Sequence, residues 1–115
     1  MDFTVSLKKN HEFRRLYNKG KNTASQFVAV YSMKNGKNIN RLGITVSAKI
    51  GGAVQRNRIR RRLKEIYRIN EQRIISGYDI VIVARMRCVD SDYKELETSL
   101  TGVLKRMSLM HNDIT

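Results

Sequence analysis

The spacing of apolar residues predicts a long helix in the middle of the chain. Between residues 53 and 75, apolar side chains recur at every third or fourth position, which places them on one face of a helix. The pair Ser76-Gly77 then provides a stop signal. The inward stripe of this predicted helix consists of Ile59, Leu63, Ile66 and Asn70.

Shorter helical patterns lie toward both ends of the chain. Residues 10–18 predict a helix with Asn10 as its N-cap, Gly20 as its stop, and Phe13 and Tyr17 on one face. So short a helix is stable only when it docks on other elements. A last helix is predicted from residue 91 or 92 to about residue 110.

Three segments show the composition of strands. Residues 26–33 and 41–47 flank a polar stretch whose Asn35-Gly36 pair suits a tight turn, so we expect an antiparallel hairpin. Residues 80–84 form a β-branched run that is apolar on both faces, which indicates a central strand within residues 78–85. This order of elements predicts an α+β fold with helices packed on a small sheet.

Length and composition favour one domain over residues 1–115. The chain has 115 residues, of which 41% are apolar, and it contains no repeat or Pro-rich linker. We expect flexibility only at residues 1–5 and 111–115.

The charge of the chain is strongly one-sided. It carries 23 Lys and Arg residues against 10 Asp and Glu residues, a net charge of +13, which is typical of proteins that bind a polyanion. A membrane is disfavoured as the partner, because the longest apolar run, residues 80–84, is far shorter than the roughly 20 residues of a spanning helix. The N-terminus shows no export signal, so we expect a cytoplasmic protein.

Few residues are available for metal binding or catalysis. Cys88 is the only cysteine, and His11 and His111 lie near opposite ends of the chain without ligands at suitable spacing. No carboxylate cluster or nucleophile–base pair is evident either. The sequence therefore predicts neither a metal site nor a catalytic residue in the protein, which argues against a protein-only nuclease.

The predicted central helix separates charge from apolar surface. Arg60, Lys64 and Arg68 follow one another along its outer flank, and Arg58 and Arg61 widen the charged area. By spacing, Glu65 is expected to relieve only Arg61 or Arg62. A solvated face is the simple alternative, but the excess of Arg over Lys favours contact with a nucleic-acid backbone. The Gly51-Gly52 pair before the helix fits a phosphate site or a plain turn equally well.

Several motifs give the chain a family resemblance. Asp79-Ile80-Val81-Ile82-Val83-Ala84-Arg85, Arg41-Leu42-Gly43-Ile44, and Leu7-Lys8-Lys9-Asn10 with Phe13 support a longer signature. That signature is Val46-Ser47-Ala48-Lys49-Ile50-Gly51-Gly52-Ala53-Val54-Gln55-Arg56-Asn57-Arg58-Ile59-Arg60-Arg61. With it, residues 6–107 resemble the bacterial ribonuclease P protein subunit. Ala48 and Gly52 depart from the usual family residues, so one phosphate contact is expected to be missing.

The resemblance implies both a fold and a role. The implied fold is a two-layer sandwich on a mixed four-stranded sheet, in the order αβββαβα, with a left-handed βαβ crossover. The implied role is to assist a catalytic RNA subunit that removes the 5′ leader of precursor tRNA. Magnesium would be bound mainly by that RNA, and the partners would be the RNA subunit and the leader, with no protein partner required.

The resemblance also implies two groups of site residues. A cleft for the single-stranded leader would use Phe13, Tyr17 and Tyr31, or Phe27 if the strand register slips by one residue near Ser25. Ordinary core packing of the first helix explains Phe13 and Tyr17 equally well. Contact with the RNA subunit would fall to Lys49, Arg56, Asn57, Arg58, Arg60, Arg61, Lys64 and Arg68.

Two other classes of protein share part of this pattern. A ribosomal component would have the same size and charge, but it would not need an aromatic cleft. A sequence-specific DNA-binding regulator could use Gln55 and Asn57 on base edges, but it would want a partner helix just before residue 53, where strands are predicted instead.

Overall fold

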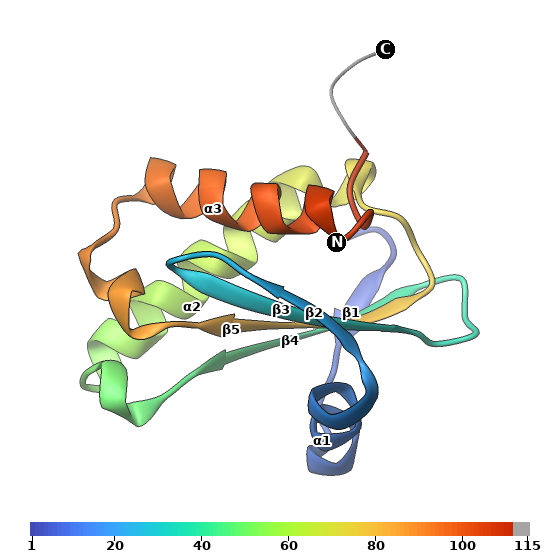
Figure 1. Ribbon diagram of the computed structural model, residues 1–115, viewed down its shortest axis with the longest axis horizontal. Helices are drawn as coiled ribbons and strands as arrows, with labels where there is room; N and C mark the ends of the chain where they lie inside the picture. Colours follow the sequence, from blue (N-terminus) through green and yellow to red (C-terminus); the bar gives the residue numbers. More distant parts are fainter. Residues whose placement is uncertain (112–115) are drawn as a thin grey trace.

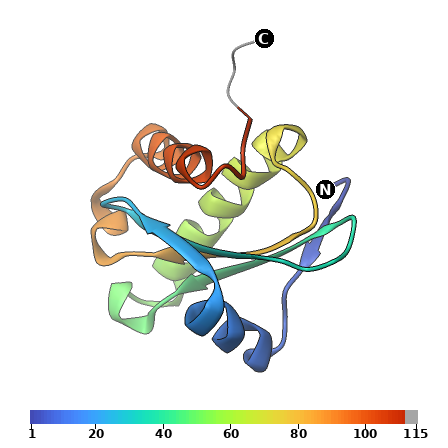
Figure 2. The same ribbon diagram turned by 45° about the vertical axis from the view of Figure 1, so that its right-hand side comes forward.

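The computed structural model describes residues 1–111 as a sheet with helices on both faces. The order of the strands is β1-β4-β5-β3-β2. Helix α1 lies on one face of the sheet, and α2 and α3 cover the other (Figures 1 and 2). The elements are β1 (Thr4–Ser6), α1 (Asn10–Lys19), β2 (Lys21–Ala24), β3 (Val28–Lys34), β4 (Asn40–Val46), η1 (Ala48–Ile50), α2 (Ala53–Asn70), η2 (Glu71–Arg73), β5 (Tyr78–Ala84), η3 (Met86–Asp90) and α3 (Tyr93–Arg106).

Strand β5 occupies the centre of the sheet, as its apolar run predicted. It pairs in parallel with β4 and antiparallel with β3 over its whole length. The predicted hairpin of β3 and β4 is therefore wrong, because β5 lies between them. The polar turn is present, with Gly36 at φ 72°, but it connects β3 to β4 across the position of β5 and not to a neighbouring strand. Because β5 is apolar on both faces, it is most stable in the centre of the sheet, where helices cover both its faces and strands pair with both its edges.

The sheet has five strands rather than the four that the resemblance implied. The additional strand, β1, pairs in parallel with the start of β4, and the N–H of Leu7 extends the pairing to the carbonyl of Leu42 at 2.9 Å. Residues 1–5, expected to be a flexible end, thus contribute to the sheet. Only three residues long, β1 has too little alternation to be recognised in the sequence.

A buried polar group anchors this N-terminal segment. The carboxylate of Glu71, 3% exposed, accepts hydrogen bonds from the N–H groups of Asp2 and Phe3 at 2.8 and 3.2 Å. Nearby, the hydroxyl groups of Thr4 and Tyr67 lie 3.0 Å apart. The first residues are therefore attached to the end of α2, which the sequence pattern gave no means to foresee.

Helix α2 buries the predicted stripe and crosses from β4 to the parallel neighbour β5. This is the βαβ unit that the resemblance implied. The helix ends at Asn70, earlier than predicted, because the chain tightens into η2, where Glu71 turns inward. The buried residues of α2 are Ile59, Leu63, Ile66, Tyr67 and Asn70.

The other helices also match their predicted positions, with different ends. Lys9 rather than Asn10 is the N-cap of α1, and Gly20 ends it as predicted. Asp92 caps α3 by accepting a hydrogen bond from the N–H of Glu95 at 2.8 Å. Helix α3 ends at Arg106 because Ser108, at φ 60°, turns the chain back toward the core. Of the expected flexible tail, residues 112–115 lie outside the described residues.

Candidate nucleic-acid interface

The outer side of α2 carries a group of basic side chains, which we call the α2 basic surface. It lies opposite the buried stripe, as the sequence predicted, although Val54 and Ile69 are exposed on the same helix. Because these cations gather on one helix, an extended anion can contact several of them at once. Its exposed members are Arg58, Arg61, Lys64 and Arg68, with Arg60 and Arg62 partly exposed at its flanks.

One cation of this surface is neutralised within the protein. Arg68 donates two hydrogen bonds to the carboxylate of Glu65, at 2.9 and 2.6 Å, and this lowers the pKa of Glu65. The expectation that Glu65 would relieve Arg61 or Arg62 is therefore wrong, because Arg68 follows Glu65 in the helix, which is the favourable order for such a pair, and binds its carboxylate with two hydrogen bonds. Arg58, Arg61 and Lys64 form no ion pair within residues 1–111.

The first turn of α2 and the loop before it hold the remaining predicted contacts. Asn57 is exposed and accepts a hydrogen bond from Arg60 at 3.0 Å. Arg56 is partly buried, and its Nε has no hydrogen-bond partner among residues 1–111. Lys49 extends from η1 into solvent. At Gly52, the N-cap, an added Cβ would meet open space, so a larger polar residue would fit there.

An aromatic groove lies on the opposite face of the sheet, where α1 crosses it. The rings of Tyr17 and Tyr31 meet edge to face, with centroids 5.0 Å apart. The hydroxyl of Tyr17 is 3.2 Å from that of Thr45 on β4. Tyr17 and Thr45 line a groove of about 500 Å³ together with Phe13, Asn10 and Arg14. Sequence reasoning missed Arg14 and Thr45, although a helical wheel places Arg14 beside Tyr17.

The three aromatic residues near this groove differ in exposure. Phe13 and Tyr31 are partly buried against a small apolar cluster that includes Leu16, whereas Tyr17 is 38% exposed. Tyr31 does not line the groove itself but supports the ring of Tyr17. Phe27 does not belong to the groove: it is buried in the main core beneath α2 and α3. Phe27 precedes β3, which begins only at Val28, so the alternation of that strand does not extend to its side chain.

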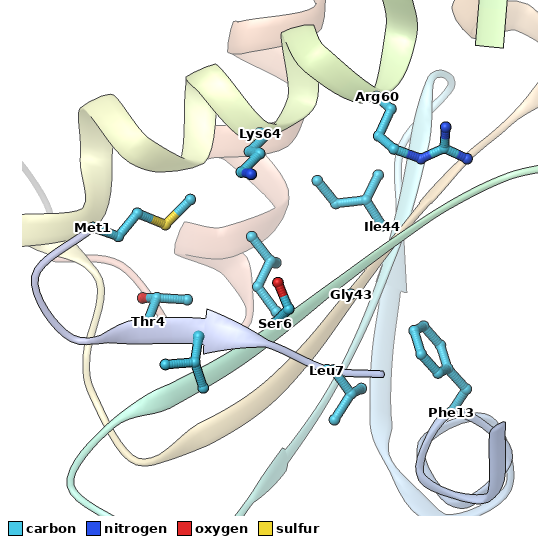
Figure 3. Close-up of a pocket in the computed structure, with 11 residues that line it drawn as sticks. Met1, Thr4, Ser6, Leu7, Phe13, Gly43, Ile44, Arg60 and Lys64 are labelled. Atoms are coloured by element: carbon cyan, nitrogen blue, oxygen red, sulfur yellow. The ribbon is translucent and has the colours of Figure 1, made fainter. Parts of the chain in front are cut away.

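The α2 basic surface and the aromatic groove meet at the edge of β4. A pocket of about 360 Å³ lies between α2 and the β1–β4 edge, with Arg60 and Lys64 reaching into it from α2 (Figure 3). Phe13 closes the other side of this pocket and also lines the aromatic groove. A flexible strand lying in the groove would therefore meet Arg60 and Lys64 as it passes the ring of Phe13.

An ionic cluster attaches α1 to the sheet. Arg41 of β4 donates to both oxygens of Asp79 on β5, at 2.8 and 2.6 Å, and also to Glu12 of α1. The hydrogen bond to Asp79 outweighs burial, and with Glu12 it raises the pKa of Arg41 above its ordinary value. The position of the groove aromatics thus depends on an Arg of the sheet.

Within residues 1–111, no cluster of three or more Cys, His or carboxylate side chains offers a metal site. In the same part of the chain, no helix combines the length and apolar character that crossing a membrane demands. Cys88 is buried, and its burial raises the pKa of the thiol.

Comparisons with known proteins agree with this geometry. Residues 1–108 match the family model described as Ribonuclease P. The chain is 44% identical over 108 residues to the "Ribonuclease P protein component" of Alkaliphilus oremlandii, covering 94% of this chain and 95% of that protein. It is 42% identical over 112 residues to the protein of the same name from Clostridioides difficile, covering 95% and 98% of the two chains.

Solved structures show the same similarity. The RNase P protein of Staphylococcus aureus superposes with a TM-score of 0.87 at 35% identity, covering 93% of this chain and 98% of that chain. The protein from Thermotoga maritima gives a TM-score of 0.82 at 32% identity, covering 88% and 96%. The resemblance found in the sequence is thereby confirmed. The chain belongs to the family of ribonuclease P protein components.

Proposed function

We propose that, within the ribonuclease P ribonucleoprotein, this chain binds the catalytic RNA subunit through the α2 basic surface and holds the single-stranded 5′ leader of precursor tRNA in the aromatic groove. It thereby assists the endonucleolytic cut that produces the mature 5′ end of the tRNA. Catalysis is assigned to the RNA, together with the magnesium ions that the reaction requires. The ribonucleoprotein would act in the cytoplasm.

One observation carries the assignment of the leader. Tyr17 presents an exposed ring, in edge-to-face contact with Tyr31, beside Phe13 at the mouth of the pocket that holds Arg60 and Lys64. Single-stranded RNA is commonly held by stacking of its bases on aromatic rings beside cations that follow its phosphates. The groove offers the rings, and the pocket at the β4 edge offers the cations.

The α2 basic surface suits the larger RNA. It belongs to α2, which lies on the other side of the sheet from α1 and the groove (Figure 1), and most of its cations have no carboxylate partner among residues 1–111. Arg guanidinium groups match phosphate geometry better than Lys ammonium groups do. A folded RNA bound to Arg58 and Arg61 on this surface would leave the groove free for the leader, whose phosphates would reach Arg60 and Lys64 at the β4 edge.

The direct test is cleavage of precursor tRNA by a bacterial ribonuclease P RNA at low magnesium, with and without this protein. We expect the protein to stimulate cleavage by the RNA, whereas the protein without the RNA should not cleave precursor tRNA. An unchanged cleavage rate, with tight RNA binding retained, would instead indicate a structural RNA-binding protein of the ribosomal kind.

A further inference from the structure

A second group of cations lies at the far edge of the sheet, away from α2 and the groove. Lys19 ends α1, Lys21 begins β2 and Lys34 ends β3. Together they border a cavity of about 390 Å³, which we call the far-edge pocket. Its other lining residues are Ser32, Met33, Tyr78, Met107 and Leu109.

The three lysines of this pocket have no ionic partner among residues 1–111. Within that part of the chain, no carboxylate lines the pocket and none of the lysines forms an ion pair. Lys21 pairs across the strands with Ser32, two residues before Lys34 on the same face. Such diagonal neighbours lie about 7 to 8 Å apart, close enough for their charges to repel. An external anion would relieve this repulsion.

The floor of the pocket is apolar and includes an aromatic ring. Tyr78 is the cross-strand partner of Lys34 and is partly buried. Met107 and Leu109 close the pocket from the α3 side, where the turn at Ser108 brings the chain back. Cations around an apolar floor with one aromatic ring suit a ligand that combines phosphate with a flat base.

The far-edge pocket is distinct from both surfaces described above. Met107 and Leu109 close it on the face that α2 and α3 cover, whereas the groove lies on the face that α1 covers (Figure 1). The pocket lies at the β3–β2 edge, whereas α2 packs on β4 toward the opposite edge. Strands β4 and β2 are separated by β5 and β3, which corresponds to about 14 Å at the usual strand spacing. One phosphate cannot bridge that distance. A ligand here would be a different stretch of RNA from those bound to α2 or the groove.

We propose that the far-edge pocket binds an unpaired nucleotide of RNA, with the phosphates on Lys21 and Lys34 and the base against Tyr78. This goes beyond the proposed roles of α2 and the groove. It rests on the chain's partnership with RNA, and not on leader binding in the groove. The nucleotide can come from the catalytic RNA or from the precursor tRNA, since both offer the same chemistry.

The first test is an NMR titration of the full chain carrying Tyr17→Ala with a short oligouridylate. This substitution weakens the groove, so that binding elsewhere becomes visible. We expect oligouridylate to shift the amide resonances of Tyr78 and Met107. These shifts should disappear when Lys21→Ala and Lys34→Ala are added to Tyr17→Ala. The absence of shifts at these amides would overturn the proposal.

The second test finds the source of the nucleotide and controls for charge. Lys21→Ala/Lys34→Ala is compared with Lys94→Ala/Lys105→Ala, which removes the same charge from α3. For each variant we measure the affinity for the isolated RNA subunit and the affinity of the holoenzyme for precursor tRNA. Lys21→Ala/Lys34→Ala should weaken one of these affinities roughly tenfold, because two specific phosphate contacts are lost, and the control variant should weaken it much less. A loss confined to the isolated RNA subunit identifies that RNA as the source, and a loss confined to precursor tRNA on the holoenzyme identifies the substrate.

Two outcomes of the second test would refute the far-edge pocket. One is an equal loss of affinity in the two double variants, and the other is no loss for either RNA. As a check that does not depend on charge, Tyr78→Leu keeps an apolar side chain but removes the ring. It should weaken oligouridylate binding about fivefold or more at a temperature at which circular dichroism shows the variant to be folded. Failure of this pocket would leave leader binding at Tyr17 untouched, because the two sites are tested by separate variants.

Discussion

Gly43 of β4 lies directly beneath the ring of Phe13. A Cβ added to Gly43 would come within 2.6 Å of Cε1 and Cζ of that ring, closer than real side-chain contacts. The missing side chain lets α1 settle against the sheet and places Phe13 between the aromatic groove and the pocket that holds Arg60 and Lys64. The glycine of the Arg41-Leu42-Gly43 motif therefore shapes the junction of the two candidate RNA surfaces.

Replacing Gly43 with Ala should displace the ring of Phe13. We expect a loss of about 1 to 3 kcal/mol in unfolding free energy, as for other overpacked sites, and a higher Michaelis constant for precursor tRNA. The control is Gly102→Ala in α3, where a Cβ meets open space and should stabilise the helix by up to about 1 kcal/mol. Similar behaviour of the two variants in chemical denaturation would contradict the close contact.

The ring of Tyr17 should contribute more to the binding of precursor tRNA than its hydroxyl group does. Tyr17→Ala is expected to weaken binding of precursor tRNA to the holoenzyme by about 1 to 3 kcal/mol, the usual contribution of one stacked base. Tyr17→Phe loses only the contact with Thr45 and should bind nearly normally. Affinities for mature tRNA serve as the reference, because they should not change. Equal losses with and without the leader would count against the groove.

The α2 basic surface should control the salt dependence of binding to the RNA subunit. Arg58→Ala/Arg61→Ala removes two exposed cations that have no carboxylate partner among residues 1–111, so the slope of log affinity against log salt should become less steep by roughly 1.8. Arg68→Ala should change the slope less, since Glu65 already neutralises Arg68. Adding Arg56→Ala should reduce the slope further. An unchanged slope in the double variant would remove these residues from the interface.

Arg41 should stabilise the protein by attaching α1. Arg41→Lys cannot keep the bidentate pair with Asp79 and also reach Glu12, so we expect a loss of about 1 to 3 kcal/mol in unfolding free energy. Glu12→Gln should cost less, because it weakens only one of these contacts. The loss of unfolding free energy in the double variant Arg41→Lys/Glu12→Gln should be smaller than the sum of the losses in the two single variants. Strict additivity would show that Arg41 and Glu12 act independently.

The stability of the N-terminal attachment should depend on pH through Glu71. Burial alone would raise its pKa, but hydrogen bonds from Thr4 and from the N–H groups of Asp2 and Phe3 lower it overall. A carboxylate with a lowered pKa contributes stability above its unfolded value, about 4.3, and loses it as the pH falls further. Glu71→Gln should remove this part of the acid sensitivity. Identical stability profiles of the two proteins between pH 6 and about pH 3 would refute the assignment.

Local patterns in the sequence were sufficient for the helices and for the α2 basic surface. The three- and four-residue spacing of Ile59, Leu63 and Ile66 fixes which side of α2 is buried, because a helix converts that spacing directly into one face. The same geometry turns Arg58 and Arg61 outward. Likewise, the doubly apolar run of β5 required a central position, and the family was recognisable from the residues around Arg56.

The relations between distant segments were decided only by the tertiary structure. β5 separates β3 from β4, β1 joins the edge of β4, and Phe27 packs in the main core rather than beside Tyr31. The alternation of residues along one strand indicates which of them share a face, but it does not indicate which other strand pairs with that strand. That choice depends on covering the faces and edges left open by every other element at once, and so the far-edge pocket and the place of Thr45 in the groove could not be predicted from the sequence alone.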